Sequence, residues 1–578
     1  MKRLLLFFSI YCSLAISFHL HAQDQWENLL DSVFMTRGEV YFSFSVQSKS
    51  EINELTKIIS SDNVKGFEVT AYANKKEFKR FLEKRYSYKI LPPPSTLLDE
   101  TELNMGGFQT DREGRTVWNF YPTYQQYLDI MAGFATNYPA ICRVDTIGTA
   151  ANPAYDRLIL AVKISDSVQF ERGKPQFLYT SSIHGDETTG YVLMLHLIDY
   201  LLTNYGTDPR ITEIVNNTEI FINPLANPDG TYHGGNNSVY GAQRYNSLNV
   251  DLNRNYPDPK AGPHPDGNAW QEETVAFMNF ADSSHFVLSM NFHGGAEVFN
   301  YPWDTWAKLH PDNDWFDFLG REYADTVHLY GPSGYLTFMD NGVTNGYAWY
   351  SITGGRQDYM TYFQHGREVT LEISDVKLLP ASQLLNHWEY NYRSFLNYIE
   401  QANYGINGQV TDSLTGQPLK AKVNIFLHDF DNSYVYSSLP TGWYFRPIEE
   451  GSYDLSFSAE GYFTKTIKNV TATKWNTTRL NVQLVPLTNG GLNDYQSPKL
   501  SFFPNPANGI TRVMLPESSS SLSTLEMFNI FGQSVLLKQI VLQDQPYLDI
   551  DLTGIRKGVY FIRIKQDSHI YDGKLIIE

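Results

Sequence analysis

The chain has 578 residues, which is too many for one hydrophobic core and predicts three to five domains. Charged residues make up 19% and aromatic residues 15%, a composition typical of folded domains with many strands and not of a disordered protein. The formal net charge of −18 argues against a nucleic-acid partner, which would need a basic face, and is compatible with a cationic substrate.

Residues 1–22 have the features of a secretory signal peptide. Lys2 and Arg3 precede the apolar run LLLFFSIYCSLAISF, and the small residue Ala22 stands where cleavage would occur. The run is too short and too poorly flanked to span a membrane, and no other run of about twenty apolar residues occurs. We therefore expect an exported protein without a membrane-spanning segment. After cleavage Cys142 is the one cysteine left, so we expect no intramolecular disulfide.

A small α/β domain is predicted over residues 24–95. Its pattern runs strand, helix, strand, helix, strand over residues 39–46, 50–60, 66–73, 75–85 and 86–91. The domain ends at the stiff PPPS stretch, and residues 96–117, which show little pattern, follow as a linker.

Helices and apolar strands alternate over residues 118–402, which predicts an α/β domain with a mixed, mostly parallel sheet and helices on both faces. Short strands with turn signals every 8–12 residues predict a β-sandwich over residues 404–487. A polar linker at 488–499 precedes a second β-sandwich at 500–578.

The stretch SSIHGDETTG places His184 and Glu187 between a predicted strand and a predicted helix. Open α/β sheets bind their ligands at the carboxyl ends of strands, so this pair could hold a metal. The spacing alone is a weak signal, because a surface turn or a first-turn acid would look the same.

A third ligand and a base can be sought at other strands of the same domain. The strand HFVLSMNFHGG ends in His293, which could instead only cap a turn. Glu372 lies inside the strand REVTLEIS, where it points either to solvent or inward. An inward orientation would raise its pKa, which is the direction that benefits a general base.

Six motifs occur in the order and spacing typical of one protein family: HGDE, NPDG, RYNSLNVDLNRNYPD, NFHGG with NYPWD, WYSITGGRQDY and TLEIS. They are similar to the zinc carboxypeptidases, in particular to the regulatory branch that includes carboxypeptidases N, E and D. The likeness covers roughly residues 118–400. GQVTDSLTGQPLKAKV and SYDLSFSAEGY resemble the transthyretin-like sandwich that follows the catalytic domain in that branch.

The resemblance implies one Zn²⁺ held by His184, Glu187 and His293, with a water at the fourth position. Glu372 matches the general base, which takes a proton from the attacking water and passes it to the leaving amine. Arg244 matches the arginine that stabilises the oxyanion.

Asn253 and Arg254 match the pair that grips a free C-terminal carboxylate, a bidentate task suited to arginine. Tyr350 matches the mobile tyrosine that closes over the substrate. The alternatives are that Arg244 and Arg254 each form a surface ion pair and that Tyr350 is a core residue.

Specificity rests on fewer residues. In the N/E/D branch, the positions of Asp304 and Gln357 face a basic C-terminal side chain, although Asp304 could instead lie in a surface turn. Arg356 replaces the usual methionine, and a cation there could weaken the binding of Lys or Arg. Asp186 occupies a position where some members carry a substrate-binding arginine that this branch also lacks.

The flanking domains resemble known modules to different degrees. The first is similar, in its order of elements alone, to the activation segment of pancreatic-type carboxypeptidases, so an inhibitory or an accessory role is open. SFFPNPANG, FNIFGQSV and LTGIRKGVYFIRI resemble the C-terminal sorting domain of type IX secretion substrates of Bacteroidetes. This likeness implies the type IX machinery as a partner, while a carbohydrate-binding or adhesive module is the alternative.

We therefore expect a metallocarboxypeptidase, secreted or held at the cell surface, that acts on peptides or proteins with a free C-terminus. The residue released would be Lys or Arg. Two alternatives remain: a zinc amidase or peptidase for cell-wall or non-standard peptides, and a non-catalytic surface-binding protein on a peptidase scaffold.

Overall fold

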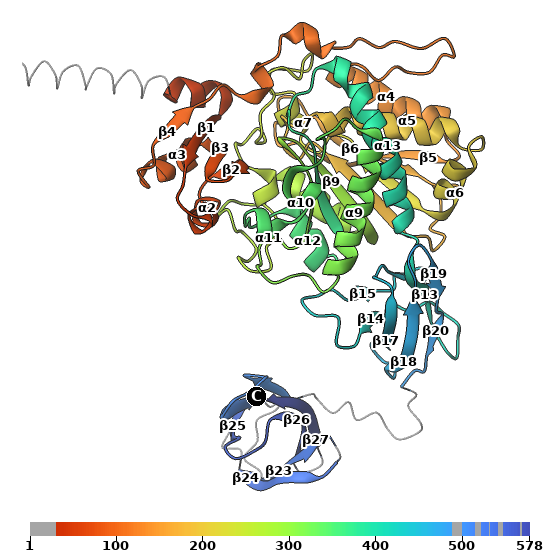
Figure 1. Ribbon diagram of the computed structural model, residues 1–578. Coiled ribbons are helices and arrows are strands. Elements are labelled where there is room, and N and C mark those ends of the chain that lie inside the picture. The colour runs from red at the N-terminus through yellow and green to blue at the C-terminus, as the bar shows by residue number, and fades with distance from the viewer. Residues whose placement is uncertain (1–29, 488–499, 515–521, 531, 542–546, 567–568) are drawn as a thin grey trace, which may run out of the picture. The chain divides into compact units, whose positions relative to one another are not determined.

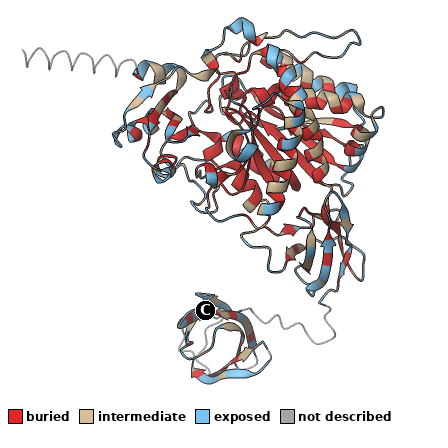
Figure 2. Ribbon diagram, viewed as in Figure 1, coloured by how far each residue is buried: buried red, intermediate tan, exposed pale blue. Residues whose placement is uncertain are grey.

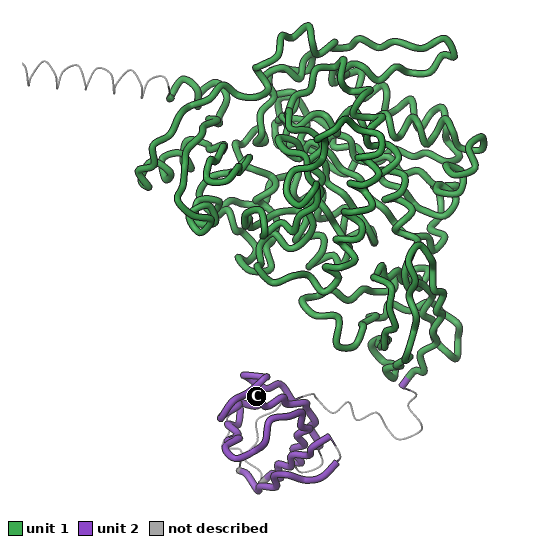
Figure 3. Tube along the Cα trace, viewed as in Figure 1, with its two compact units in different colours: residues 1–486 green, residues 487–578 purple. Residues whose placement is uncertain are grey.

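The computed structural model of the chain describes residues 30–487, 500–514, 522–530, 532–541, 547–566 and 569–578. The chain forms two compact units, residues 1–486 and 487–578 (Figure 3). The predicted signal peptide and the predicted linker at 488–499 lie outside the described residues. None of the described helices is long and apolar enough to cross a membrane.

A four-stranded antiparallel sheet with the order β2-β3-β1-β4 forms the N-terminal segment, here defined as residues 39–90. Its elements are β1 (Glu39–Ser45), α2 (Lys49–Leu55), β2 (Ser60–Lys65), β3 (Glu68–Asn74), α3 (Lys75–Leu82) and β4 (Tyr88–Ile90). Phe42 and Phe44 of β1 pack against Phe81 of α3, in an apolar core that also includes Ala296, Val298 and Trp349 of the domain of the central sheet.

One strand of this segment differs from the prediction. The helix expected over residues 50–60 ends at Leu55, and β2 begins at Ser60. The sequence of β2, SSDNVK, has no alternation of apolar residues, because part of it contacts polar groups of the candidate site described below. A strand of this kind gives no hydrophobic signal.

An eight-stranded mixed sheet forms the centre of the first unit, in the order β11-β10-β12-β9-β7-β8-β6-β5. Its strands are β5 (Cys142–Thr149), β6 (Leu158–Ile164), β7 (Gln176–Ser181), β8 (Glu219–Asn223), β9 (Phe286–His293), β10 (Ala296–Tyr301), β11 (Val343–Asn345) and β12 (Glu368–Ser374). The central strands β12, β9, β7 and β8 are parallel neighbours. β6 pairs antiparallel with β5 and β8, and β10 pairs antiparallel with β12 but parallel with β11. The predicted mixed, mostly parallel sheet is confirmed.

Helices cover both faces of the central sheet, as predicted (Figure 1). They are α4 (Tyr124–Asn137), α5 (Thr189–Asn204), α6 (Pro209–Asn217), α7 (Pro228–Thr231), α8 (Glu272–Asp282), α9 (Asn313–Tyr330), α10 (Phe338–Gly342), α11 (Gly346–Trp349), α12 (Arg356–Tyr362) and α13 (Ala381–Gln401). Along β7, Phe177 and Tyr179 join the core beneath α5 and α13, while Leu178 joins the core beneath α8. The strand is buried on both faces, as the red centre of Figure 2 shows.

Two further sheets form the β-sandwich of the first unit, around one apolar core. Its strands are β13 (Gly405–Asp412), β14 (Lys422–Ile425), β15 (Val435–Tyr436), β16 (Trp443–Arg446), β17 (Gly451–Ser458), β18 (Lys465–Ala472), β19 (Thr477–Arg479) and β20 (Val482–Leu484). Arg446 of the sandwich pairs with Asp312 at 2.9 Å, and Arg367 pairs with the same carboxylate at 2.8 Å. This buried ion network attaches the sandwich to the domain of the central sheet.

The second unit consists of a three-stranded and a four-stranded sheet around its own core. Its strands are β21 (Ser501–Phe503), β22 (Ile510–Met514), β23 (Leu522–Asn529), β24 (Ser534–Val541), β25 (Tyr547–Asp551), β26 (Gly558–Gln566) and β27 (His569–Ile577). This arrangement is consistent with the predicted second sandwich.

Candidate active site

His184 and Glu187 lie in the tight turn between the end of β7 and the start of α5. Ser182 takes a positive φ of 56° there, and its hydroxyl donates to the Glu187 carbonyl oxygen at 2.8 Å. A side chain at Gly185 would meet the Gly230 backbone at 2.3 Å, so glycine is required. The turn therefore aims both predicted ligands out from the end of the sheet.

His293 is the last residue of β9, which runs parallel to β7, so the carboxyl ends of the two strands meet. His184 Nδ1 lies 3.0 Å from both Glu187 Oε1 and His293 Nδ1, and His293 Nδ1 lies 2.9 Å from Glu187 Oε2. Ligands about 2.1 Å from a tetrahedral zinc lie about 3.4 Å apart, so these three donors need little movement to hold the ion. Two imidazoles and one carboxylate also match the donor set of catalytic zinc sites.

Asp251 orients two members of the site and was not predicted. Its Oδ1 lies 3.1 Å from His184 Nε2, the ring nitrogen turned away from the metal position, and its Oδ2 accepts from Arg244 Nε at 3.0 Å. A carboxylate behind a ligating histidine fixes the ring and its tautomer. The signal was present in the quoted motif VDLNR, two residues before Asn253.

The electrostatics of the cluster favour a charged Glu187 and a neutral His293, the protonation states in which these side chains bind a metal. Burial would raise the pKa of Glu187, but the neighbouring His184, Lys377 and His293 outweigh burial and hold that pKa well below its usual range. Burial lowers the pKa of His293 to about 4, which keeps the imidazole neutral. Lys377, another residue that was not predicted, places Nζ 2.6 Å from Glu187 Oε1.

Glu372 stands beside the predicted metal ligands because of strand register. β12 pairs with β9 in parallel, and Glu372 is the register partner of His293. Its side chain points inward, where Oε2 is buried and has no hydrogen-bond partner among the described residues. Burial, followed by the nearby Glu187 charge, raises the pKa of Glu372 well above its usual range.

The predicted arginines and Asn253 gather at the same site. Arg244 Nη1 lies 3.5 Å from Glu187 Oε1, within reach of a group bound at the metal. Arg254 donates from Nη1 to the Asn253 carbonyl at 2.8 Å, and its buried Nε has no partner within the described part of the chain. Asn253 accepts the Arg356 N–H through Oδ1 at 2.9 Å, and its Nδ2 lies 3.5 Å from His293 Nε2.

The residues predicted to set specificity are buried. Asp304 lines the cavity beside the metal position, accepts from Asn300 Nδ2 at 3.2 Å, and has its pKa raised to about 6 by burial. Gln357, in the first turn of α12, has both amide atoms buried and without a partner in the described residues. Arg356 points elsewhere and pairs with Glu368 at 3.1 Å.

The N-terminal segment closes this site. Ser61 and Asp62 of β2 line a remaining cavity of about 40 Å³. Asp62 Oδ1 lies 2.7 Å from Lys377 Nζ and 3.6 Å from Arg244 Nη1. The Tyr350 hydroxyl donates to the Ser61 carbonyl at 3.5 Å. The predicted mobile tyrosine thus lies against the N-terminal segment.

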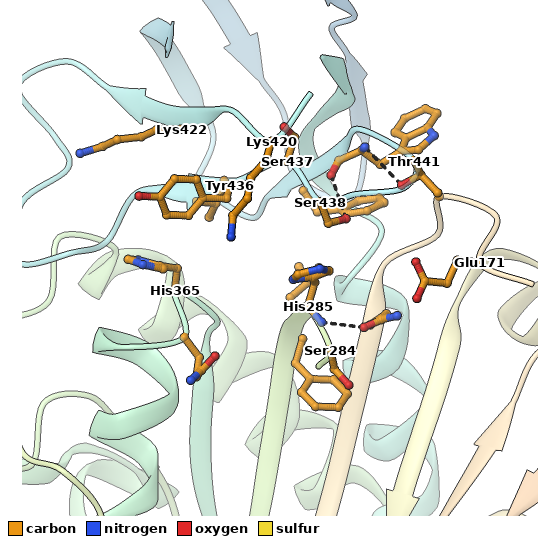
Figure 4. Close-up of a pocket in the computed structure, with 18 of the residues that line it drawn as sticks. Glu171, Ser284, His285, His365, Lys420, Lys422, Tyr436, Ser437, Ser438 and Thr441 are labelled. Atoms are coloured by element: carbon orange, nitrogen blue, oxygen red, sulfur yellow. Dashed lines mark hydrogen bonds between the residues drawn. The ribbon is translucent and has the colours of Figure 1, made fainter. Parts of the chain in front are cut away.

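A wider cleft of about 750 Å³ opens elsewhere, between the sandwich and the domain of the central sheet (Figure 4). Lys420 and Tyr436 line it from the sandwich, and His285 and His365 face them from the other side. His285 precedes β9 at its amino end, whereas His293 closes the carboxyl end. The cleft therefore shares no lining residue with the candidate metal site.

Comparison with known families separates the chain into three parts. The family model described as zinc carboxypeptidase matches residues 127–394, and the carboxypeptidase regulatory-like domain matches residues 405–485. Residues 501–578 match a secretion system C-terminal sorting domain, which indicates export to the cell surface or beyond. These matches confirm the predicted resemblances.

Individual relatives match more than half of the chain. Carboxypeptidase M of Mus musculus is 35% identical over 358 residues, which are 57% of this chain and 77% of that protein. Carboxypeptidase D of Homo sapiens is 35% identical over 373 residues, 61% of this chain, but the chain spans only 26% of its length. The structure of carboxypeptidase A from Helicoverpa armigera matches with a TM-score of 0.51 at 18% identity, covering 64% of this chain and 98% of that one. This last likeness concerns the fold alone.

Proposed function

Because the chain belongs to the zinc carboxypeptidase family, we propose that it is an exported enzyme that hydrolyses the C-terminal peptide bond of peptides or proteins. The observation that carries the proposal is the meeting of His184, Glu187 and His293 at two strand ends, with Glu372 in register beside them. Zinc held by the three ligands would polarise the scissile carbonyl and lower the pKa of a water molecule.

The other residues would divide the remaining tasks. Glu372, whose pKa is raised, accepts the proton of the attacking water and passes it to the leaving amine. Arg244 is held by Asp251 beside the metal ligands and stabilises the negative charge that develops on the carbonyl oxygen. Asn253 and Arg254 grip the free C-terminal carboxylate, which makes the enzyme an exopeptidase.

We propose further that the released residue is Lys or Arg. Asp304 offers a buried carboxylate to a cationic side chain and leaves an apolar one poorly received. The concern that Arg356 would repel such a substrate is weakened by its contacts, because its charge is paired with Glu368 and directed away from the cavity.

A second proposal is that the N-terminal segment keeps the enzyme inactive. The cavity of about 40 Å³ is far smaller than the roughly 300–1,000 Å³ of ordinary small-molecule sites. A terminal residue cannot enter while β2 stays in place. The segment is held by several polar contacts, including Tyr72 to Asp186 at 2.5 Å and Asn63 to the Gly295 carbonyl at 2.6 Å.

For the C-terminal unit we propose the type IX secretion machinery as the partner. The match of residues 501–578 to a sorting domain supports this assignment. The enzyme would then act outside the cell or at its surface.

The test is release of the terminal residue from matched peptides ending in Lys, Arg, Leu or Phe, measured before and after the chain is cut in the exposed turn at 112–115. Release of Lys and Arg, abolished by Glu372→Gln and selectively lost in Asp304→Ala, would support both mechanism and pocket. Release of Leu or Phe would contradict the role given to Asp304. No release from the cut, zinc-loaded chain after dilution has dissociated the segment would contradict the carboxypeptidase assignment.

A further inference from the structure

Arg356 lies buried behind the candidate active site, at one end of a series of polar contacts that leads to His293. Its Nη1 donates to Thr180 Oγ1 at 2.6 Å, and its Nη2 pairs with Glu368 Oε2 at 3.1 Å. The Thr180 hydroxyl donates to Asn291 Oδ1 at 2.9 Å. The other end of that amide, Asn291 Nδ2, lies 2.8 Å from His293 Nε2. The contacts thus connect α12, β7 and β9 to a metal ligand.

Such a network is costly to bury and must be well fixed. Arg356 is 1% exposed and Glu368 is 0% exposed, and buried charges are tolerated only when they are paired and hydrogen-bonded. Ser289 donates to Glu368 Oε2 at 2.7 Å. The backbone N–H of Arg356 is also engaged, on Asn253 Oδ1. The guanidinium is therefore a rigid donor to Thr180.

The two ligand histidines are supported differently. His184 turns Nε2 to the charged Asp251, whereas His293 turns Nε2 to the neutral Asn291 amide. A neutral amide holds an imidazole ring less strongly than a carboxylate does. The orientation of the Asn291 amide must therefore be fixed by a further hydrogen bond. Thr180, which Arg356 anchors, is in the position to do this.

We propose that Arg356 is a positioning residue of the metal centre, which acts through Thr180 and Asn291 to hold His293 with Nδ1 facing the other ligands. The inference rests on the proposed function, because it takes metal binding at His293 as the purpose of the network. When Nδ1 binds the ion, Nε2 carries the proton, so the Asn291 amide turns over to present Oδ1 to Nε2 and Nδ2 to Thr180 Oγ1, which then accepts from both Asn291 and Arg356. The contacts survive this, because an amide has both donor and acceptor ends and a hydroxyl can donate or accept.

The test compares two threonine variants of the full chain. Thr180→Val breaks the connection with little change in volume. Thr361→Val is the matched control: Thr361 is equally buried, and its Oγ1 accepts the Glu368 backbone N–H at 3.4 Å without reaching His293. The zinc dissociation constant is measured by competition with a chromophoric chelator, together with the unfolding temperature of the zinc-free protein.

We expect Thr180→Val to weaken zinc binding about tenfold, the low end of the range for groups behind a ligand. Thr361→Val should leave zinc binding unchanged even if it lowers the unfolding temperature. Thr180→Ser, which keeps the hydroxyl, should restore most of the affinity. The double variant Arg356→Met/Glu368→Gln, which removes the anchor without leaving an unpaired charge, should lose affinity as Thr180→Val does.

Unchanged zinc affinity in both Thr180→Val and the double variant would overturn the inference. An equal loss in Thr361→Val would also overturn it, since that would show general destabilisation. These results are distinct from failure of the proposed function, which would appear as a wild-type chain that binds no zinc, and which would remove the inference as well.

Discussion

Asp62 is one of the side chains through which the N-terminal segment meets the candidate active site, at Lys377 and Arg244, so Asp62→Ala tests the proposed closure. Its carboxylate contacts Lys377 at 2.7 Å and Arg244 at 3.6 Å, and all three side chains are 4% exposed or less. Removing one partner of a buried, hydrogen-bonded charge pair costs about 2–5 kcal/mol. A loss of about 2 kcal/mol corresponds to a roughly 30-fold weaker association of the N-terminal segment with the rest of the protein.

The assay measures how tightly the N-terminal segment binds the rest of the protein once the covalent link between them is cut. A specific protease site placed at the exposed turn 112–115 cuts the chain, after which residues 39–90 are held by non-covalent contacts alone. Peptidase activity is then followed as the cut protein is diluted. We expect the concentration at which half the activity appears to be about 30-fold higher, or more, in Asp62→Ala than in the wild type.

Asp31→Ala is the matched control, because Asp31 is an exposed aspartate near the same segment that pairs with Lys75 and not with the active site. It should behave as the wild type does. The reasoning is refuted if the intact wild-type chain is as active as the cut, diluted one. It is also refuted if Asp62→Ala dissociates at the wild-type concentration.

Three further predictions concern the base, the pocket and the sandwich. Glu372→Gln should bind zinc as tightly as the wild type but lower kcat about 10²- to 10⁴-fold, and a kcat of this variant near that of the wild type would exclude Glu372 as the base. Chelation of the metal should abolish activity in the wild type. Because burial raises the pKa of Asp304 to about 6, its carboxyl is charged above that pH and neutral below it, so the kcat/KM preference for Arg over Leu peptides should fall as the pH drops from 8 to 5; a flat preference would contradict this. Arg446→Ala leaves the buried Asp312 short of a partner and should lower the free energy of unfolding by about 3–5 kcal/mol in a denaturant titration, whereas the exposed Lys468→Ala should change it little; equal effects would contradict a role for the network.

The sequence predicted His184, Glu187 and His293 as candidate metal ligands because their positions follow from local pattern. His184 and Glu187 come directly after one apolar strand and His293 ends another, and parallel strands bring such ends together. Glu372 was predicted within a strand, but its inward orientation depends on the register of β12 against β9. Asp251 could have been found as an acid inside a quoted motif.

Other features carried no local signal. β2 is too polar to be predicted as a strand, and so the placement of Asp62 in the active site could not be anticipated. The same holds for Lys377, which follows β12 and reaches Glu187 across the fold. Arg356 was expected beside the substrate pocket, yet its side chain lies behind it with Glu368.

The sequence by itself thus determined the order of the domains, the central α/β sheet and the types of residue at its strand ends, since hydrophobic periodicity and short motifs depend on near neighbours along the chain. The tertiary structure alone decided which charges meet: Asp62 with Lys377 and Arg356 with Glu368. The physical reason is that a buried charge is stable only beside a partner, and that partner is supplied by strands and turns distant in sequence.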